Sequence, residues 1–236
     1  GEALIAMGKG AEAEAVLRQA IQIDPKSAMA YSRLARAQLA LAKPADAVAS
    51  AKKATELDDK FGEGFAILGV AMVAENPKVW SDAIAQAQQG AFLDPDNPIV
   101  QGAVGKIFEA NGQFEQAAGA YRKALAADPA FGPARFALIQ AELNRGNRDA
   151  AIAEARKLAA GGMSSADIER LIGEDAVRRQ DYSGAIPFLE KATKGLPGNP
   201  DGWALLGRSY HAARRYDEAA EAYGKAVELA PQNANY

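Results

Sequence analysis

The chain is 236 residues long, 49% of its residues are hydrophobic, and its formal net charge is −3. This balance gives no global support for nucleic-acid binding, which needs a strongly basic face. The absence of cysteine excludes disulfides, thiolate catalysis and cysteine-based zinc sites. No apolar run approaches the roughly 20 residues that a membrane-spanning helix needs, so we expect no direct membrane insertion.

A repeating pattern is present from the first residues. Residues 1–27 supply only the latter part of one repeat, which ends at Pro25. Because the chain begins at Gly1 without a methionine and partway through a helix by register, we expect it to be a piece of a longer protein. Residues 28–61 form the first full repeat, in which Asp59 takes the place of the closing proline.

The second full repeat, residues 62–97, is longer than the others. The interval between Gly69 and Ala83 exceeds the corresponding interval in the last repeat by two residues. We therefore place a two-residue insertion in the turn around Asn76 and Pro77.

Four further repeats follow at a constant interval of 34 residues: 98–131, 132–165, 166–199 and 200–233. With Pro200 and its equivalents as position 1, position 20 is alanine in all four. Positions 8 and 27 are small and position 32 is proline, except in the repeat 132–165. Residues 234–236 are expected to start a further helix or a linker.

These intervals predict an all-α chain with two antiparallel helices, A and B, in each repeat. Neither helix can bury its apolar stripe alone, so neighbouring repeats must cover one another. We expect Asn97 and Asn199 to cap the A helices that follow them, and Pro44 and Pro77 to lie in the first turns of B helices. The connection 161–165 lacks the usual proline and is either an ordinary degenerate turn or a hinge.

The last repeat carries the clearest motif. It reads Trp203-x-x-Leu206-Gly207-x-x-Tyr210, followed by Ala219, Tyr223, Ala226 and Pro231. This spacing resembles the tetratricopeptide signature, and the resemblance covers the whole chain. It implies a right-handed superhelical solenoid of antiparallel helix pairs, whose concave wall, lined by the A helices, binds peptides or partner proteins.

In such a solenoid, positions 2, 5, 9, 12 and 13 of each A helix face the concave groove. We expect apolar anchors in the middle of the groove, with basic side chains engaging polar or acidic groups of a bound segment. The candidate groove residues are Arg36, Val70, Val73, Lys106, Phe136, Gln140, Leu143, Arg170, Arg208 and His211. The clamp of lysine and asparagine with which some members of the family capture chaperone C-termini is absent, because Ser32 and Arg36 occupy its first positions.

The sequence offers no recognisable catalytic site. Its single histidine, His211, is interpreted as a polar groove residue and not as a base. Gly105 and Lys106 do not begin a phosphate-binding loop, since Ile107 stands where such a loop needs serine or threonine. We therefore expect a non-enzymatic chain without a metal or a cofactor.

The expected function is that of a protein–protein interaction scaffold of a bacterial cytoplasm or periplasm. The resemblance leaves an alternative open: the recognition arm of a larger bacterial enzyme of the sulfotransferase or glycosyltransferase type, or of an exopolysaccharide secretion assembly. Self-association through uncapped terminal repeats is a third possibility. Arg178-Arg179 and Arg214-Arg215 are either solvated turn charges or a basic patch for phosphate or acidic peptides.

Overall fold

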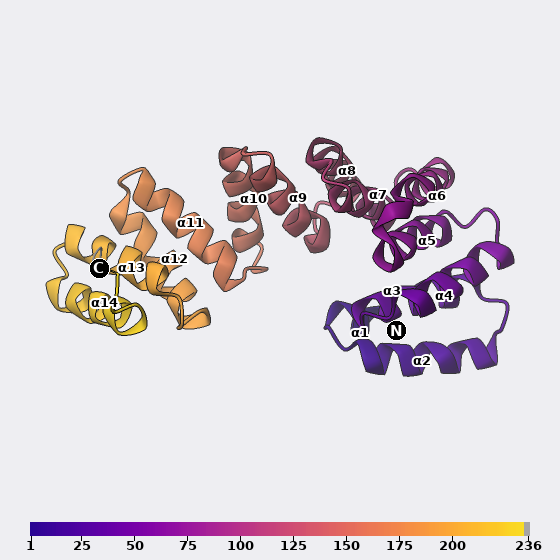
Figure 1. The fold of residues 1–236 in the computed structure, drawn as a ribbon, viewed down its shortest axis with the longest axis horizontal. Helices are drawn as coiled ribbons and strands as arrows, with labels where there is room; N and C mark the ends of the chain where they lie inside the picture. The colour runs from indigo at the N-terminus through magenta and orange to yellow at the C-terminus, as the bar shows by residue number, and fades with distance from the viewer. Residues whose placement is uncertain (234–236) are drawn as a thin grey trace. The chain divides into compact units, whose positions relative to one another are not determined.

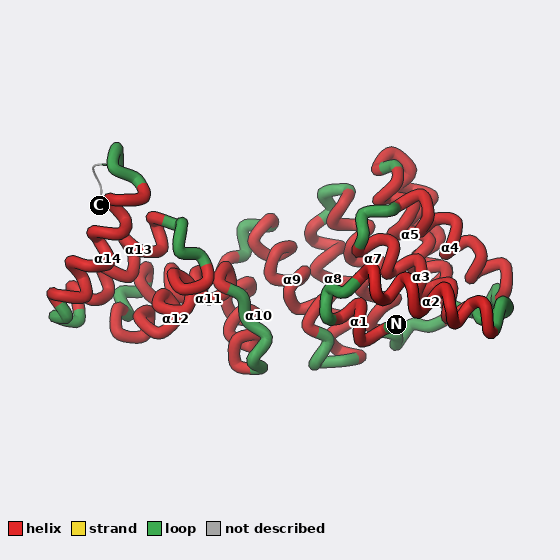
Figure 2. Tube along the Cα trace, turned by 90° about the horizontal axis from the view of Figure 1, so that it is seen from below, coloured by secondary structure: helices red, strands yellow, loops and turns green. Residues whose placement is uncertain are grey.

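The computed structural model describes residues 1–233, apart from the side chain of Ala6, and this part of the chain is built from α-helices and one 3-10 turn (Figures 1 and 2). The all-α expectation is confirmed. The expected start of a further helix at 234–236 lies outside the described residues. None of the helices within residues 1–233 combines the length and apolar character that a bilayer crossing requires.

The chain divides into two compact units, Gly1–Gly146 and Asn147–Tyr236. The first unit contains α1 (Glu2–Ala6), α2 (Gly10–Ile23), α3 (Ala28–Ala40), α4 (Pro44–Leu57), α5 (Gly62–Glu75), the 3-10 helix η1 (Pro77–Val79), α6 (Trp80–Leu93), α7 (Pro98–Ala110), α8 (Phe114–Ala127) and α9 (Gly132–Asn144). The second contains α10 (Arg148–Ala160), α11 (Ala166–Arg178), α12 (Tyr182–Gly195), α13 (Pro200–Ala212) and α14 (Tyr216–Leu229). The connection 161–165 therefore lies inside the second unit and not at the boundary between the two.

Within each unit, consecutive helices pack side by side in chain order. The odd-numbered A helices also pack on one another, α1 on α3, α3 on α5, α5 on α7 and α7 on α9 in the first unit, and α11 on α13 in the second. Inside either unit, the described B helices of successive repeats do not approach one another in this way. Each stack is therefore closer on its A side, so the A helices form its inner layer.

Most of the expected helix ends are present. Asn97 accepts a hydrogen bond from the amide of Ile99 at 2.9 Å, and Asn199 accepts one from Gly202 at 2.9 Å. Pro44 opens α4 as expected. Pro77 opens η1, so the inserted residues form a short 3-10 turn in front of α6.

A hydrogen bond that the sequence analysis did not anticipate joins successive repeats at position 4 of the A helix. There a side chain donates to the carbonyl of the proline that ends the preceding repeat. The three pairs are Gln101 with Pro95 at 2.8 Å, Arg135 with Pro129 at 2.7 Å, and Trp203 with Pro197 at 2.9 Å. In α11 the same position is Glu169, a carboxylate that cannot donate, and its Oε2 is buried without a hydrogen-bond partner. The connection 161–165 therefore lacks the hydrogen bond that joins these three other pairs of successive repeats at this position.

Apart from the turn at Asn76, where φ is −146°, the A–B turns share one residue with positive φ, at position 15. In three turns this residue is a glycine: Gly8, Gly112 and Gly146. In three others it carries a side chain, and φ lies between 54° and 65°: Ala42, Gln180 and Arg214. A residue with a Cβ is strained in this left-handed region.

We expect Arg214→Gly to stabilise the second unit by about 0.5–1 kcal/mol, because relief of the strain outweighs the added freedom of the unfolded chain. Urea unfolding followed by circular dichroism measures the change. Gly112→Ala is the matched reverse substitution: its Cβ would meet no atom within 4 Å, so the φ of 72° alone should lower stability. A lower midpoint for Arg214→Gly would contradict the strain argument.

Where position 8 of an A helix is glycine, the A helix lies close to the B helix of the same repeat. A Cβ added to Gly69 would lie closer to the backbone oxygen of Ala83 than van der Waals contact permits, and one added to Gly105 would overlap the ring of Tyr121. Position 8 therefore sets how near the two helices can come.

Candidate functional site

The apolar candidates of the first unit differ in how much surface they expose. Val73 is 7% exposed and packs in a core cluster with Ile84 and Val104, so it is a core residue and not an available groove anchor. Val70 on α5 is half-buried. On α9, Phe136 is 40% exposed, while Leu143 is half-buried and Gln140 is exposed.

Arg36 on α3 is ion-paired within its own unit. Its guanidinium donates to Glu2 at 2.8 Å and lies 3.7 Å from Glu63, which also accepts a hydrogen bond from Ser32 at 3.3 Å. Burial raises the pKa of Glu63, against the opposing charge of Arg36. The guanidinium of Arg36, which was expected to contact a ligand, is therefore already paired with the carboxylates of Glu2 and Glu63.

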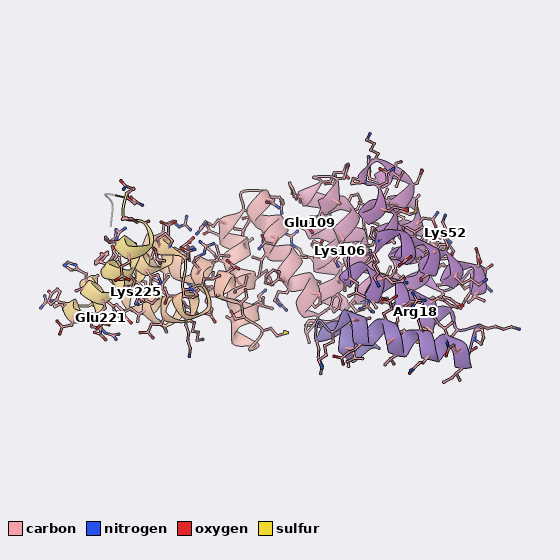
Figure 3. The ribbon with its side chains drawn as sticks, turned by 60° about the horizontal axis from the view of Figure 1, so that its bottom comes forward. Arg18, Lys52, Lys106, Glu109, Glu221 and Lys225 are labelled. Carbon is pink, nitrogen blue, oxygen red and sulfur yellow. The ribbon has the colours of Figure 1, made fainter. Side chains whose placement is uncertain are left out.

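Lys106 on α7 is exposed and has no ion-pair partner among residues 1–233. Partial desolvation by the surrounding helices lowers its pKa, and the charge of Arg36 adds to this effect. Glu109 lies on the same helix (Figure 3) and raises that pKa, but its carboxylate accepts the hydroxyl of Tyr121 at 2.6 Å. Lys106 is thus a solvent-accessible cation in a partly dehydrated setting.

Each groove candidate of the second unit contacts a charged or aromatic side chain of the same unit. Arg170 pairs with Glu174. Arg208 lies over the ring of Tyr182, 5.7 Å from its centroid, and donates to the Tyr182 hydroxyl at 3.3 Å. His211 packs edge-on against another aromatic ring, that of Tyr216.

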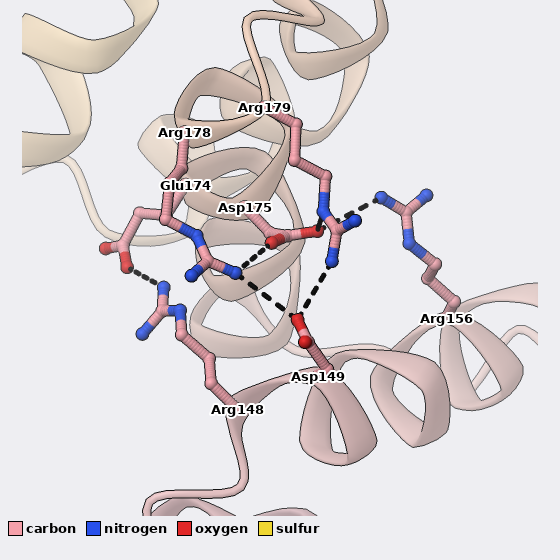
Figure 4. A network of polar contacts seen from close by, with 7 residues as sticks. All are labelled: Arg148, Asp149, Arg156, Glu174, Asp175, Arg178 and Arg179. Carbon is pink, nitrogen blue, oxygen red and sulfur yellow. Dashed lines mark hydrogen bonds and ion pairs between the residues drawn. The ribbon is translucent and has the colours of Figure 1, made fainter.

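A polar network joins α10 to α11 in the second unit (Figure 4). Its centre is Asp175, which is 1% exposed and accepts hydrogen bonds from Arg178 at 2.8 Å and Arg179 at 2.9 Å. Asp149 pairs with both arginines, and Arg156 lies 3.7 Å from Asp175. Arg178 and Arg179 are thus paired with carboxylates of their own unit, which argues against a free basic patch at these two residues.

This network was not predicted from the sequence. Neither was a similar network at Glu142 in the first unit, where the buried carboxylate pairs with Arg122 and Arg145. The available signal was an acidic residue in the last part of an A helix. At position 10, where Asp175 lies, other repeats carry Ala37, Ala71 or Ile107, and at position 11, where Glu142 lies, they carry Gln38, Met72 or Phe108. A buried carboxylate requires a partner.

We expect the second unit to lose stability as the pH falls below about 4. Burial alone would raise the pKa of Asp175, but the hydrogen bonds from Arg178 and Arg179 outweigh it, and the pKa lies below its ordinary value of 3.8. A depressed carboxyl pKa stabilises the fold above the unfolded value, and this contribution is lost as the pH falls through the folded one. Urea midpoints at pH 6 and pH 3, compared between the unaltered chain and Asp175→Asn, measure the effect; equal pH dependence in both would refute it.

The described residues offer little that resembles a catalytic centre or a metal centre. No group of three or more histidine, aspartate and glutamate side chains within residues 1–233 is placed to hold a metal ion. The geometry instead defines an all-α repeat protein of stacked helix pairs, with an inner layer of A helices that leaves several side chains uncovered.

Comparison with known families agrees with this class. A profile described as tetratricopeptide repeat matches residues 4–68, 109–173 and 176–236, and a second profile of the same description matches residues 80–132. The chain belongs to the tetratricopeptide repeat family.

A yeast protein is similar in sequence to part of this chain. Superkiller protein 3 of Saccharomyces cerevisiae is 27% identical over 93 residues, which are 37% of this chain and 6% of that protein. The chain therefore spans only a small part of this relative.

Several solved structures share the fold. Pseudomonas aeruginosa pilF has a TM-score of 0.69 at 19% identity, with 87% of this chain and 93% of that chain covered. Thermus thermophilus TTC0263 has a TM-score of 0.60 at 20% identity, with 91% and 95% covered. The Cut9-Hcn1 hetero-tetramer of the APC/C has a TM-score of 0.62 at 14% identity, with 98% of this chain and 45% of that chain covered.

Proposed function

We propose that this chain is a protein-interaction scaffold whose first unit binds a partner segment on its A-helix layer. The observation that carries the proposal is Phe136, a large aromatic side chain that is 40% exposed on the inner layer of the stack. Gln140, one helical turn further along α9, is exposed as well. An aromatic anchor beside polar groups is the usual composition of a binding surface.

The proposed ligand is an unstructured or helical segment of another protein. Such a segment loses chain entropy when it docks, so its affinity is modest unless several side chains are anchored together. Among solved structures with this fold, that of Cut9-Hcn1 is a complex of two kinds of chain, which supports a role in assembly.

Selection of a phage-displayed library of random 12-residue peptides on the whole chain tests the proposal. We expect enriched peptides whose binding is weakened at least about ten-fold by Phe136→Ser, since a buried aromatic anchor carries a large share of the binding energy. The matched control is Phe92→Ser, because Phe92 is 81% exposed on the B helix α6. Failure to enrich any peptide, or equal sensitivity to both substitutions, would overturn the assignment of the surface.

A further inference from the structure

The four cations predicted for the groove are not equivalent. Arg36 is paired with Glu2 and Glu63. Arg170 is paired with a glutamate, and Arg208 lies on a tyrosine ring and donates to its hydroxyl. Lys106 alone among these four has no ion-pair partner or aromatic partner within the described part of the chain.

The surroundings of Lys106 favour a single negative charge. Its side chain is exposed and forms no ion pair within residues 1–233, so a carboxylate of a bound segment can pair with it directly. Glu109 on the same helix is held by the hydroxyl of Tyr121, and Glu63 lies beside Arg36. Because the carboxylate of Glu109 remains close to Lys106, a run of several acidic residues would be repelled where one acidic residue is attracted.

The apolar end of this surface lies on the next A helix. Phe136 is on α9, and α9 packs against α7, which carries Lys106. Packed helix axes are about 8–10 Å apart, and an extended chain rises about 3.3 Å per residue. Two ligand side chains that reach neighbouring A helices are therefore separated by about three residues.

Building on the proposed function, we infer that the first unit recognises a segment with one aspartate or glutamate that pairs with Lys106, and one aromatic or aliphatic residue about three positions away that packs on Phe136. The second unit does not share this preference, because its groove cations already have partners.

The same peptide library, selected separately on the unaltered chain, on Lys106→Glu and on Lys123→Glu, tests the inference. Lys123 is an exposed lysine on the B helix α8 and serves as the matched control. We expect an acidic residue and an apolar residue about three apart in the peptides from the unaltered chain and from Lys123→Glu. Lys106→Glu should replace the acidic residue by lysine or arginine, and should weaken the original peptides about ten-fold or more.

Two failures can be told apart. Peptides that are enriched and depend on Phe136, but that lack an acidic residue or bind Lys106→Glu equally well, overturn the role of Lys106 and leave the proposed function standing. If no peptide is enriched on any of the three chains, both the inference and the proposed function are wrong. Retained circular dichroism of Lys106→Glu excludes unfolding as the cause of a loss, as expected for an exposed site.

Discussion

Gly69→Ala lowers the free energy of unfolding of the first unit by about 1–3 kcal/mol. The added methyl group would collide with the backbone oxygen of Ala83 and lie 2.9 Å from Cδ1 of Ile107, which is buried. A backbone oxygen inside a helix cannot rotate away, so α5 and α6 have to move apart. The core cluster at this crossing, which contains Ala83 and Ile107, then loses contacts.

Each unit contains one tryptophan, Trp80 or Trp203, which allows the two to be followed separately. Urea unfolding of Gly69→Ala in a Trp203→Phe background reports the first unit through Trp80. Gly119→Ala is the control, since its Cβ would meet no atom within 4 Å. It should raise stability by about 0.5–1 kcal/mol, as expected for glycine replaced by alanine in a helix. An unchanged midpoint for Gly69→Ala would show that the crossing can widen freely.

Tyr121→Ala has the largest expected effect, a loss of about 3–5 kcal/mol in the first unit. Tyr121 is 1% exposed, and its ring fills the space above Gly105. The substitution leaves a cavity there and removes the hydrogen bond to Glu109. Tyr121→Phe removes only that bond and should cost about 1 kcal/mol.

The repeat 132–165 suggests how this loss can be compensated. Where the repeat 98–131 has glycine at position 8 and tyrosine at position 24, it has Ile139 and Ala155, both fully buried. Gly105→Ile alone overpacks the crossing, whereas Gly105→Ile combined with Tyr121→Ala refills the cavity from the other helix. We expect the double variant to be about 1–3 kcal/mol more stable than the sum of the single changes predicts. Strict additivity, measured by the same Trp80 fluorescence, would contradict this account.

The sequence was sufficient to predict the helix pairs and two of the caps. The interval of 34 residues and the prolines at position 32 are local signals, and Asn97 and Asn199 cap the helices expected of them. The insertion near Asn76 was predicted in its place, but its 3-10 conformation was not. The backbone conformation of the inserted residues depends on how they pack against the helix that follows, α6.

The candidate site was harder to predict, because the position of a residue in its repeat does not specify its neighbours. Arg36 and Lys106 share position 9, yet one is ion-paired and the other is not. The difference arises from Glu2 and Glu63, which lie far from Arg36 in sequence and reach it only through stacking. Val73 was predicted to line the groove but is buried for a related reason: its exposure depends on the side chains of neighbouring helices, such as Ile84 and Val104, that pack against it.

The hydrogen bonds to the closing prolines have a consequence for comparing the sequences of distantly related repeat proteins. Gln101, Arg135 and Trp203 differ in size, charge and aromaticity, yet each performs the same task by offering an N–H group. Scoring schemes that treat an exchange of glutamine for tryptophan as a drastic change will underrate kinship at this column. At this position the presence of an N–H donor describes the shared contact better than the identity of the residue does.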